Sequence, residues 1–326
     1  MKGIVQVIIL IIFMFIGIPL VVGLAFSERS EGFIIDYSSQ KIETPERIKV
    51  WNEEKGKVEK VDFEEYVINV VASEMPSNFE IEALKSQAVA ARTYAMSKII
   101  KFDEKEPESH PKAPVCNTTH CQVYKNKKTL IELHDKGWEK DGYEKVKKAC
   151  EETEGEMIYY KGQIIMQPLF FSSSGGQTEN SEDVFSDEYP YLISVSSPYE
   201  EGASHRNEKK TFEAEEVANM LNSSYEDRST GKIDSSNVKV LSRTAGGRVD
   251  KIQVGESIYK GTEVRNALGL SSTLFSIGFD SEKIVFTSSG FGHGVGMSQY
   301  GANGMAKEGK DYKEILTHYY TGTDVY

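Results

Sequence analysis

Pro76 restricts the fold most, because it separates two stretches that both have helical periodicity. Residues 62–75 and roughly 77–101 each place apolar side chains three and four positions apart. A proline lacks a backbone donor and pushes the preceding residue out of the helical region, so the first helix must end before it. Ser77 and Glu80 have the spacing of a capping box, which predicts that the second helix starts at Ser77. The sequence therefore predicts two helices that meet at a corner.

Glu74 lies at this corner, on the apolar face of the first predicted helix. It follows Val70 by four residues and Val67 by seven. A carboxylate on a buried face is costly unless it is paired or protonated. Burial also raises the pKa of a carboxyl group, which a general acid needs near neutral pH. Glu74 is therefore a candidate catalytic acid, and the alternative is that it caps its helix or pairs with Arg92.

The N-terminal part of the chain is apolar. Residues 4–26 contain no charge, and a helix of this length would extend about 34 Å, enough to cross a bilayer. We expect a transmembrane anchor at 1–26 rather than a cleaved signal peptide, because no small-residue cleavage site follows. Lys2 before the run and Glu28 after it predict a cytoplasmic N-terminus and an external remainder. Residues 27–45 are polar and are predicted to be a linker.

The net charge of −12 limits the possible functions. An acidic exterior argues against general nucleic-acid binding, which needs a basic surface. It also argues against electrostatic adhesion to an anionic cell wall. A polymer would therefore have to be bound in a shaped groove.

Residues 46–326 are predicted to form an α+β domain of mixed helices and antiparallel strands. Hairpins are expected at 47–61, with a turn at Gly56, and at 157–166, with a turn at Lys161-Gly162. From about 205 to 283 the composition changes to short strands and one helix without evident chemistry, which indicates an inserted β-rich subdomain. A strand at 284–286, a glycine-rich loop and a helix near 312–319 are expected to complete the domain.

Four potential metal ligands lie close together in the chain: His110, Cys116, His120 and Cys121. Two cysteines and two histidines are typical of a closed, tetrahedral zinc site with a structural role. The alternative is a Cys116–Cys121 disulfide, which an exported domain would favour. A zinc hydrolase is disfavoured, because a site with two thiolates usually leaves no position open for water. Cys150 is then the spare thiol.

Two segments contain glycines that would let the backbone approach a ligand closely. Residues 172–177, Ser-Ser-Ser-Gly-Gly-Gln, add hydroxyl groups but do not form the Gly-x-Ser-x-Gly turn of serine hydrolases. Residues 290–301 surround His293 with glycines and do not match a nucleotide-binding pattern. Each segment taken alone could also be a structural turn, with His293 a structural histidine.

Together these segments resemble the stage II sporulation protein D family. The resemblance rests on five motifs in the order of the family: Ser73–Pro76, Glu82–Tyr94, Thr119–Tyr124, Phe171–Gly176 and Gly292–Ala302. It covers roughly residues 46–326. It implies a peptidoglycan lytic transglycosylase that acts in forespore engulfment and cuts glycan strands from which the stem peptides have been removed.

The implied chemistry requires one carboxyl group. Glu74 would protonate the glycosidic oxygen between N-acetylmuramic acid and N-acetylglucosamine, and would then accept the proton of the muramic C6 hydroxyl. That hydroxyl attacks C1 and closes a 1,6-anhydro ring, whereas most glycosidases need a second carboxylate. The candidate sugar-contacting residues are Gln87, Arg92, Tyr94, Ser173, Ser174, His293, Ser298 and Gln299. Arg92 could instead orient Glu74, although a guanidinium would lower the pKa of the acid.

The resemblance also implies partners and a location. The partners would be the amidase named stage II sporulation protein P and the scaffold protein M. The chain would be anchored in the mother-cell membrane, with its catalytic domain in the intermembrane space facing the forespore. Some relatives are described as amidase enhancers, so the alternative function is a non-enzymatic wall-binding module that stimulates an amidase.

Overall fold

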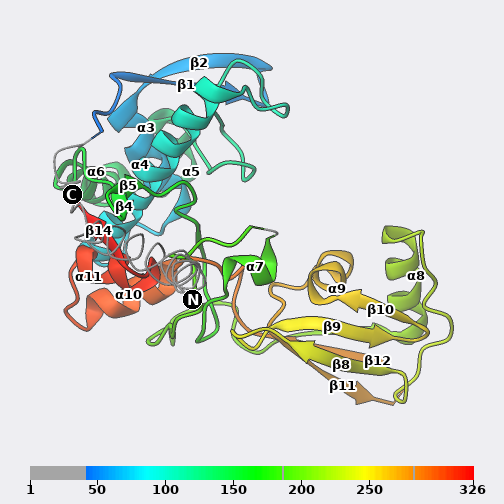
Figure 1. Ribbon diagram of the computed structural model, residues 1–326. Coiled ribbons are helices and arrows are strands. Elements are labelled where there is room, and N and C mark those ends of the chain that lie inside the picture. Colours follow the sequence, from blue (N-terminus) through cyan, green and yellow to red (C-terminus); the bar gives the residue numbers. More distant parts are fainter. Residues whose placement is uncertain (1–41, 186, 282) are drawn as a thin grey trace, which may run out of the picture. The chain divides into compact units, whose positions relative to one another are not determined.

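A computed structural model describes residues 42–326, except Ser186 and Glu282, and shows a mixed α+β architecture with several small sheets (Figure 1). The predicted anchor and most of the predicted linker lie outside the described residues. Among the described residues, no helix is both long enough and apolar enough to cross a bilayer.

The first predicted hairpin is confirmed. Strands β1 (Arg47–Asn52) and β2 (Lys57–Asp62) pair antiparallel, and Gly56 in the turn has a φ of +57°. The short strand β3 (Val115–Cys116) pairs in parallel with β1. This pairing fixes the Cys/His segment to the edge of the sheet.

The two predicted helices are α3 (Phe63–Glu74) and α4 (Ile81–Glu104). Helix α3 starts where the Asp62 carboxylate accepts a hydrogen bond from the Glu65 amide, at 3.0 Å. Helix α4 begins at Ile81, so the predicted start at Ser77 was wrong. The N-cap of α4 is Glu80, whose side chain makes no capping hydrogen bond, and the Ser77 hydroxyl instead accepts a hydrogen bond from the Trp138 indole at 2.9 Å.

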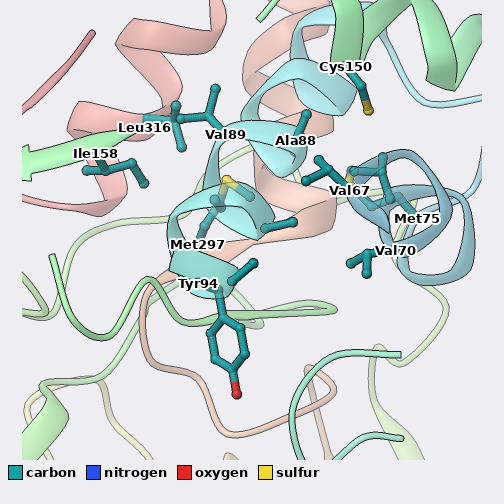
Figure 2. Close-up of a cluster of buried hydrophobic side chains, with 14 of the residues drawn as sticks. Val67, Val70, Met75, Ala88, Val89, Tyr94, Cys150, Ile158, Met297 and Leu316 are labelled. Atoms are coloured by element: carbon teal, nitrogen blue, oxygen red, sulfur yellow. The ribbon is translucent and has the colours of Figure 1, made fainter. Parts of the chain in front are cut away.

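Helix α4 lies at the centre of the main hydrophobic core (Figure 2). Ala88 and Val89 of α4 are fully buried, as are Val67 and Val70 of α3. The alanines allow neighbouring backbones to approach closely. The helices α6 (Glu144–Glu151), α10 (Gln299–Lys307) and α11 (Tyr312–Tyr319) also pack against α4. The core therefore joins segments from both ends of the described chain.

The remaining small elements connect the core to the glycine-rich segments. Helices α5 (Lys127–Leu133) and α7 (Ser181–Val184) and the π-helix η4 (Glu139–Tyr143) are short. The second predicted hairpin is confirmed as β4 (Ile158–Tyr160) and β5 (Gln163–Ile164), and β14 (Thr323–Val325) pairs with β4. Strand β6 (Phe170–Phe171) pairs in parallel with β13 (Met297–Ser298), which brings the two glycine-containing segments side by side.

Residues 208–288 form two three-stranded sheets with their own hydrophobic core. One sheet contains β7 (Glu208–Glu213), β11 (Phe275–Asp280) and β12 (Lys283–Ser288). The other contains β8 (Val238–Arg243), β9 (Val249–Val254) and β10 (Ser257–Lys260), and the helices are α8 (Ala214–Ser224) and α9 (Gly261–Leu268). Strand β12 was expected outside this subdomain, yet it pairs with both β7 and β11.

Candidate active site

Glu74 ends helix α3 with a half-buried carboxyl group. Its Oε1 accepts a hydrogen bond from the Val123 amide at 2.6 Å, and the hydroxyl of the adjacent Ser73 accepts one from the Lys125 amide at 3.2 Å. Burial raises the pKa of Glu74 above its ordinary value of 4.5, against the opposing effects of the Val123 amide and the Lys125 charge. A carboxyl group that holds its proton in this way can donate it.

Arg92 does not contact Glu74. Its guanidinium is fully buried and donates to both carboxylate oxygens of Glu64, at 2.8 and 2.7 Å. Its remaining donors reach the carbonyl oxygens of Glu156 and Cys150. The structure therefore does not support the expectation that Arg92 contacts a sugar or orients Glu74. Since a buried guanidinium needs a partner, Arg92 has a structural role.

Residues 121–125 form one side of the Glu74 site and are held by both helices. The Gln122 amide nitrogen donates to the Tyr66 hydroxyl at 3.0 Å and to the Ala91 carbonyl at 3.3 Å. The Tyr124 ring stacks on Tyr66 with a centroid separation of 5.2 Å. Tyr94 is buried, and Figure 2 shows its ring extending from α4 away from the aliphatic side chains of the core.

The four predicted metal ligands converge beside this segment. One ligand atom from each of His110, Cys116, His120 and Cys121 lies within 4.8 Å of the others. The sulfur-to-nitrogen distances are 3.3 Å from Cys121 to His110, 3.6 Å from Cys121 to His120 and 3.7 Å from Cys116 to His120. Sulfur and nitrogen ligands of one tetrahedral zinc ion lie about 3.5 Å apart, given the usual bond lengths.

The surroundings of the four ligands also suit a metal. His110 Nδ1 lies 2.9 Å from the Ala113 carbonyl, which orients the ring and leaves Nε2 facing Cys121. A backbone carbonyl behind a histidine is the usual support for a metal ligand. Cys116 and Cys121 are free thiols in the structure rather than a disulfide. A hydrogen bond from Cys121 lowers the pKa of Cys116 to about 4, so the pair favours one thiolate.

Ser174 and Ser298 are held by a carboxylate that the sequence did not reveal. Both hydroxyls are buried and donate to Glu200, which also accepts the Ser197 hydroxyl and the Gly175 amide. Their donors are therefore used within the protein, which disfavours a direct sugar contact. No motif marks Glu200, because its partners other than Ser197 lie far from it in the sequence.

Three other candidates keep polar atoms for a ligand. The Gln299 amide donates to Gln87 Oε1 at 3.4 Å, which joins α10 to α4. Among the described residues, the Gln87 amide nitrogen and the Ser173 hydroxyl have no hydrogen-bond partner, although both side chains are buried. Buried polar atoms without partners are rare in folded proteins, so these two atoms have hydrogen-bonding capacity that the described part of the fold does not use.

His293 and Gly294 lie beside Arg248, which directly precedes β9. Arg248 donates to the Ser174 carbonyl at 2.9 Å and lies 3.4 Å from the Glu179 carboxylate. Gly294 has a φ of +91°, and a Cβ there would lie 2.6 Å from the guanidinium, so only glycine fits. Burial and Arg248 lower the pKa of His293 to about 4, which keeps its imidazole neutral.

Comparison with known proteins gives two family matches. The model described as stage II sporulation protein matches residues 52–160, which include Glu74 and the Cys/His segment. A model described as a domain of unknown function (DUF8618) matches residues 186–296.

Individual relatives extend over most of the chain. Stage II sporulation protein D of Bacillus subtilis (strain 168) is 39% identical over 285 residues, covering 86% of this chain and 79% of that protein. Stage II sporulation protein D of Bacillus amyloliquefaciens is 37% identical over 286 residues, covering 87% and 79%. A protein of Bacillus subtilis (strain 168) named amidase enhancer is 28% identical over 302 residues, covering 78% of this chain and 39% of that protein.

Proposed function

Because the chain belongs to the stage II sporulation protein D family, we propose that it is a lytic transglycosylase acting on peptide-stripped peptidoglycan strands during forespore engulfment. The observation that carries this proposal is the environment of Glu74. Its carboxyl group is half-buried, has a raised pKa and receives one backbone hydrogen bond. A protonated carboxyl group at a solvent-accessible helix end is what the first step of glycan cleavage needs.

In the proposed reaction Glu74 acts twice. Its proton passes to the glycosidic oxygen as the bond from muramic C1 breaks, and the leaving N-acetylglucosamine departs as an alcohol. The Glu74 carboxylate then takes the proton from the muramic C6 hydroxyl as that oxygen bonds to C1. The Val123 amide, 2.6 Å from Oε1, stabilises the transient carboxylate.

Sugar contacts are proposed for the candidates whose polar atoms are not used by the protein itself. Gln87 and Gln299 are linked to each other on α4 and α10, and Ser173 has a free hydroxyl among the described residues. Tyr94 and His293 do not meet this criterion. The Tyr94 side chain is hydrogen-bonded to Cys121, and His293 accepts the Val295 amide at Nδ1, at 3.1 Å, and also bonds the backbone of Phe170.

A structural zinc ion is proposed at His110, Cys116, His120 and Cys121. It would contribute folding free energy through four protein ligands and would leave the acid–base chemistry to Glu74. By holding Cys121 it would fix the segment whose Val123 amide contacts Glu74.

Partners and location are proposed from the family. An amidase such as stage II sporulation protein P would supply peptide-free strands, and the membrane protein M would act as a scaffold. A membrane anchor is proposed from the apolar run at residues 4–26, and the mother-cell membrane is the location that the family implies. The relative named amidase enhancer supports a functional connection to an amidase and keeps a stimulatory, non-enzymatic function as the second candidate.

The products of the reaction test the proposal. Incubation of the purified protein with peptide-free glycan strands is expected to give muramic ends that are lighter than reducing ends by one water. Mass spectrometry of the fragments measures this difference. Ends with the full mass of a reducing muramic acid would show hydrolysis and would contradict the proposal.

The pH dependence of cleavage should follow the ionisation of Glu74. The raised pKa keeps the acid protonated at higher pH, so the rate falls only as the pH rises past that pKa. Lys125 lowers the pKa of Glu74. Lys125→Gln should therefore raise the pKa of Glu74 and move the alkaline limb of the kcat/KM profile to higher pH, by roughly a few tenths of a pH unit.

The exposed Lys128 provides a matched control. Its ammonium lies near Glu132, at 3.9 Å, and it does not influence the pKa of Glu74. Lys128→Gln should leave the profile unchanged. The assignment of this limb to Glu74 would be contradicted if the limb moved equally in both variants, or if it moved to lower pH in Lys125→Gln.

A further inference from the structure

Three neighbouring hollows lie on the surface between the Pro76 turn and the β-rich subdomain. The first is lined by residues of the Pro76 turn and α10 together with Tyr199. The second contains Tyr199, Ser173 and His205. The third contains His205, Phe291 and the cationic residues Lys210 and Arg265. Neighbouring hollows share Tyr199 or His205 in their linings, so they lie in a row, here called the groove.

Aromatic side chains line the middle of this groove. Tyr199 is 48% exposed and has a φ of +65°, a conformation that is costly for a tyrosine. Phe291 is 43% exposed and stacks on His205 with a centroid separation of 4.5 Å. Ser173, which is buried, belongs to the lining of the same hollow as Tyr199. Flat apolar faces of this kind suit the ring of a sugar.

The far end of the groove is cationic. Arg265 is half-buried, and its only hydrogen bond within the described part of the chain goes to the Leu270 carbonyl at 3.4 Å. Lys210 donates to the Gly269 carbonyl at 2.6 Å. Glu208 also lines this hollow, but its carboxylate lies 2.8 Å from His205 Nδ1. In a chain of net charge −12, a half-buried guanidinium without a carboxylate partner among residues 42–326, leaving aside 186 and 282, is available for an external anion.

We propose that Arg265 and Lys210 bind the lactyl carboxylate of a peptide-free muramic residue, while Phe291 and Tyr199 stack on the strand between this pocket and Glu74. The inference rests on the proposed function, because the strand must be the substrate. In intact peptidoglycan that carboxyl group forms an amide with the stem peptide. Removal of the peptide therefore creates the negative charge that Arg265 and Lys210 would bind. The hollow, of about 440 Å³, lies within the range of roughly 300–1,000 Å³ typical of small-ligand sites.

Binding without turnover tests the proposal. Protein carrying Glu74→Gln is titrated with peptide-free strands, and with the same strands after reduction of the carboxyl groups to alcohols. Arg265→Ala should weaken binding of the carboxylate strands roughly tenfold or more, the usual effect of losing a charge-assisted hydrogen bond. It should leave binding of the reduced strands unchanged.

Matched variants separate this effect from a change in the fold. Lys210→Ala should act in the same direction as Arg265→Ala, whereas the exposed Lys239 of β8 should be neutral when replaced by alanine. Phe291→Ala should weaken both kinds of strand, and Phe279→Ala, which removes a phenylalanine with 40% exposure from β11, should weaken neither.

Three results would overturn the inference. The first is unchanged strand binding in both Arg265→Ala and Lys210→Ala. The second is an equal loss of affinity for carboxylate and reduced strands in these variants. The third is displacement of the strand by inorganic phosphate at concentrations where acetate has no effect. The last would assign the pocket to a phosphate-bearing polymer. Failure of the proposed activity is a separate outcome, because it appears as missing anhydro products in the protein with Glu74 intact.

Discussion

Replacing Glu74 by glutamine should reduce glycan cleavage by roughly 10³-fold or more, because one side chain supplies both the acid and the base. The fold should survive this change. The glutamine carbonyl oxygen can still accept the Val123 amide, and the neutral side chain avoids the cost of burying a carboxylate. Initial rates on peptide-free strands and thermal unfolding of both proteins measure the two effects.

Glu80 is a matched control for this substitution. It lies in the same turn and is exposed, and its side chain does not cap α4. Glu80→Gln should therefore leave the cleavage rate within about twofold, as expected for a surface position. Cleavage that persists in Glu74→Gln would remove Glu74 from the mechanism. Full stimulation of an amidase by Glu74→Gln, with no cleavage by either protein, would favour the non-enzymatic function.

Removal of the metal is expected to have the second large effect. A Cys₂His₂ site adds its binding free energy to folding, and its loss should cost at least about 3 kcal/mol. For a domain of this size, such a loss lowers the Tm by roughly 6 °C or more. Cleavage should fall as well, because the Cys121 segment carries the Val123 amide to Glu74. Metal analysis and unfolding curves with and without a chelator measure these effects.

Cys150 distinguishes the metal site from a general sensitivity to cysteine loss. It is buried against the main core, outside the ligand cluster. Cys121→Ser should abolish metal binding and the effect of the chelator, whereas Cys150→Ala should keep both. A thiol count of one instead of three, in protein without zinc, would show a Cys116–Cys121 disulfide and contradict the proposed metal site.

The local sequence pattern was sufficient to predict the structural elements that are determined by a few neighbouring residues. The corner at Pro76 and the turns at Gly56 and Lys161-Gly162 were predicted because backbone restrictions of single residues determine them. Helix α10 was expected as a glycine-rich loop. Its glycines are required by packing, since a Cβ at Gly301 would lie 2.0 Å from the Tyr319 hydroxyl. Helix α9 was missed because it is short and begins at Gly261.

The parts of the candidate site that could be predicted are those in which the residue types alone indicate the chemistry. The Cys/His cluster came together as the spacing indicated. The role of Arg92 could not be predicted, because its partner Glu64 lies 28 positions earlier in the chain. The same reason explains why Glu200 and Arg248 were missed. Long-range partners decide whether a polar side chain is available to a ligand or is used by the fold.

The fate of solvent oxygen tests the central claim most directly. Peptide-free strands are cleaved in water labelled with a heavy oxygen isotope, and the new muramic ends are analysed by mass. Attack by the muramic C6 hydroxyl with Glu74 as the base predicts ends without the label, lighter than a reducing end by one water. A new muramic end that carries one labelled oxygen would show that water is the nucleophile, and would contradict the account.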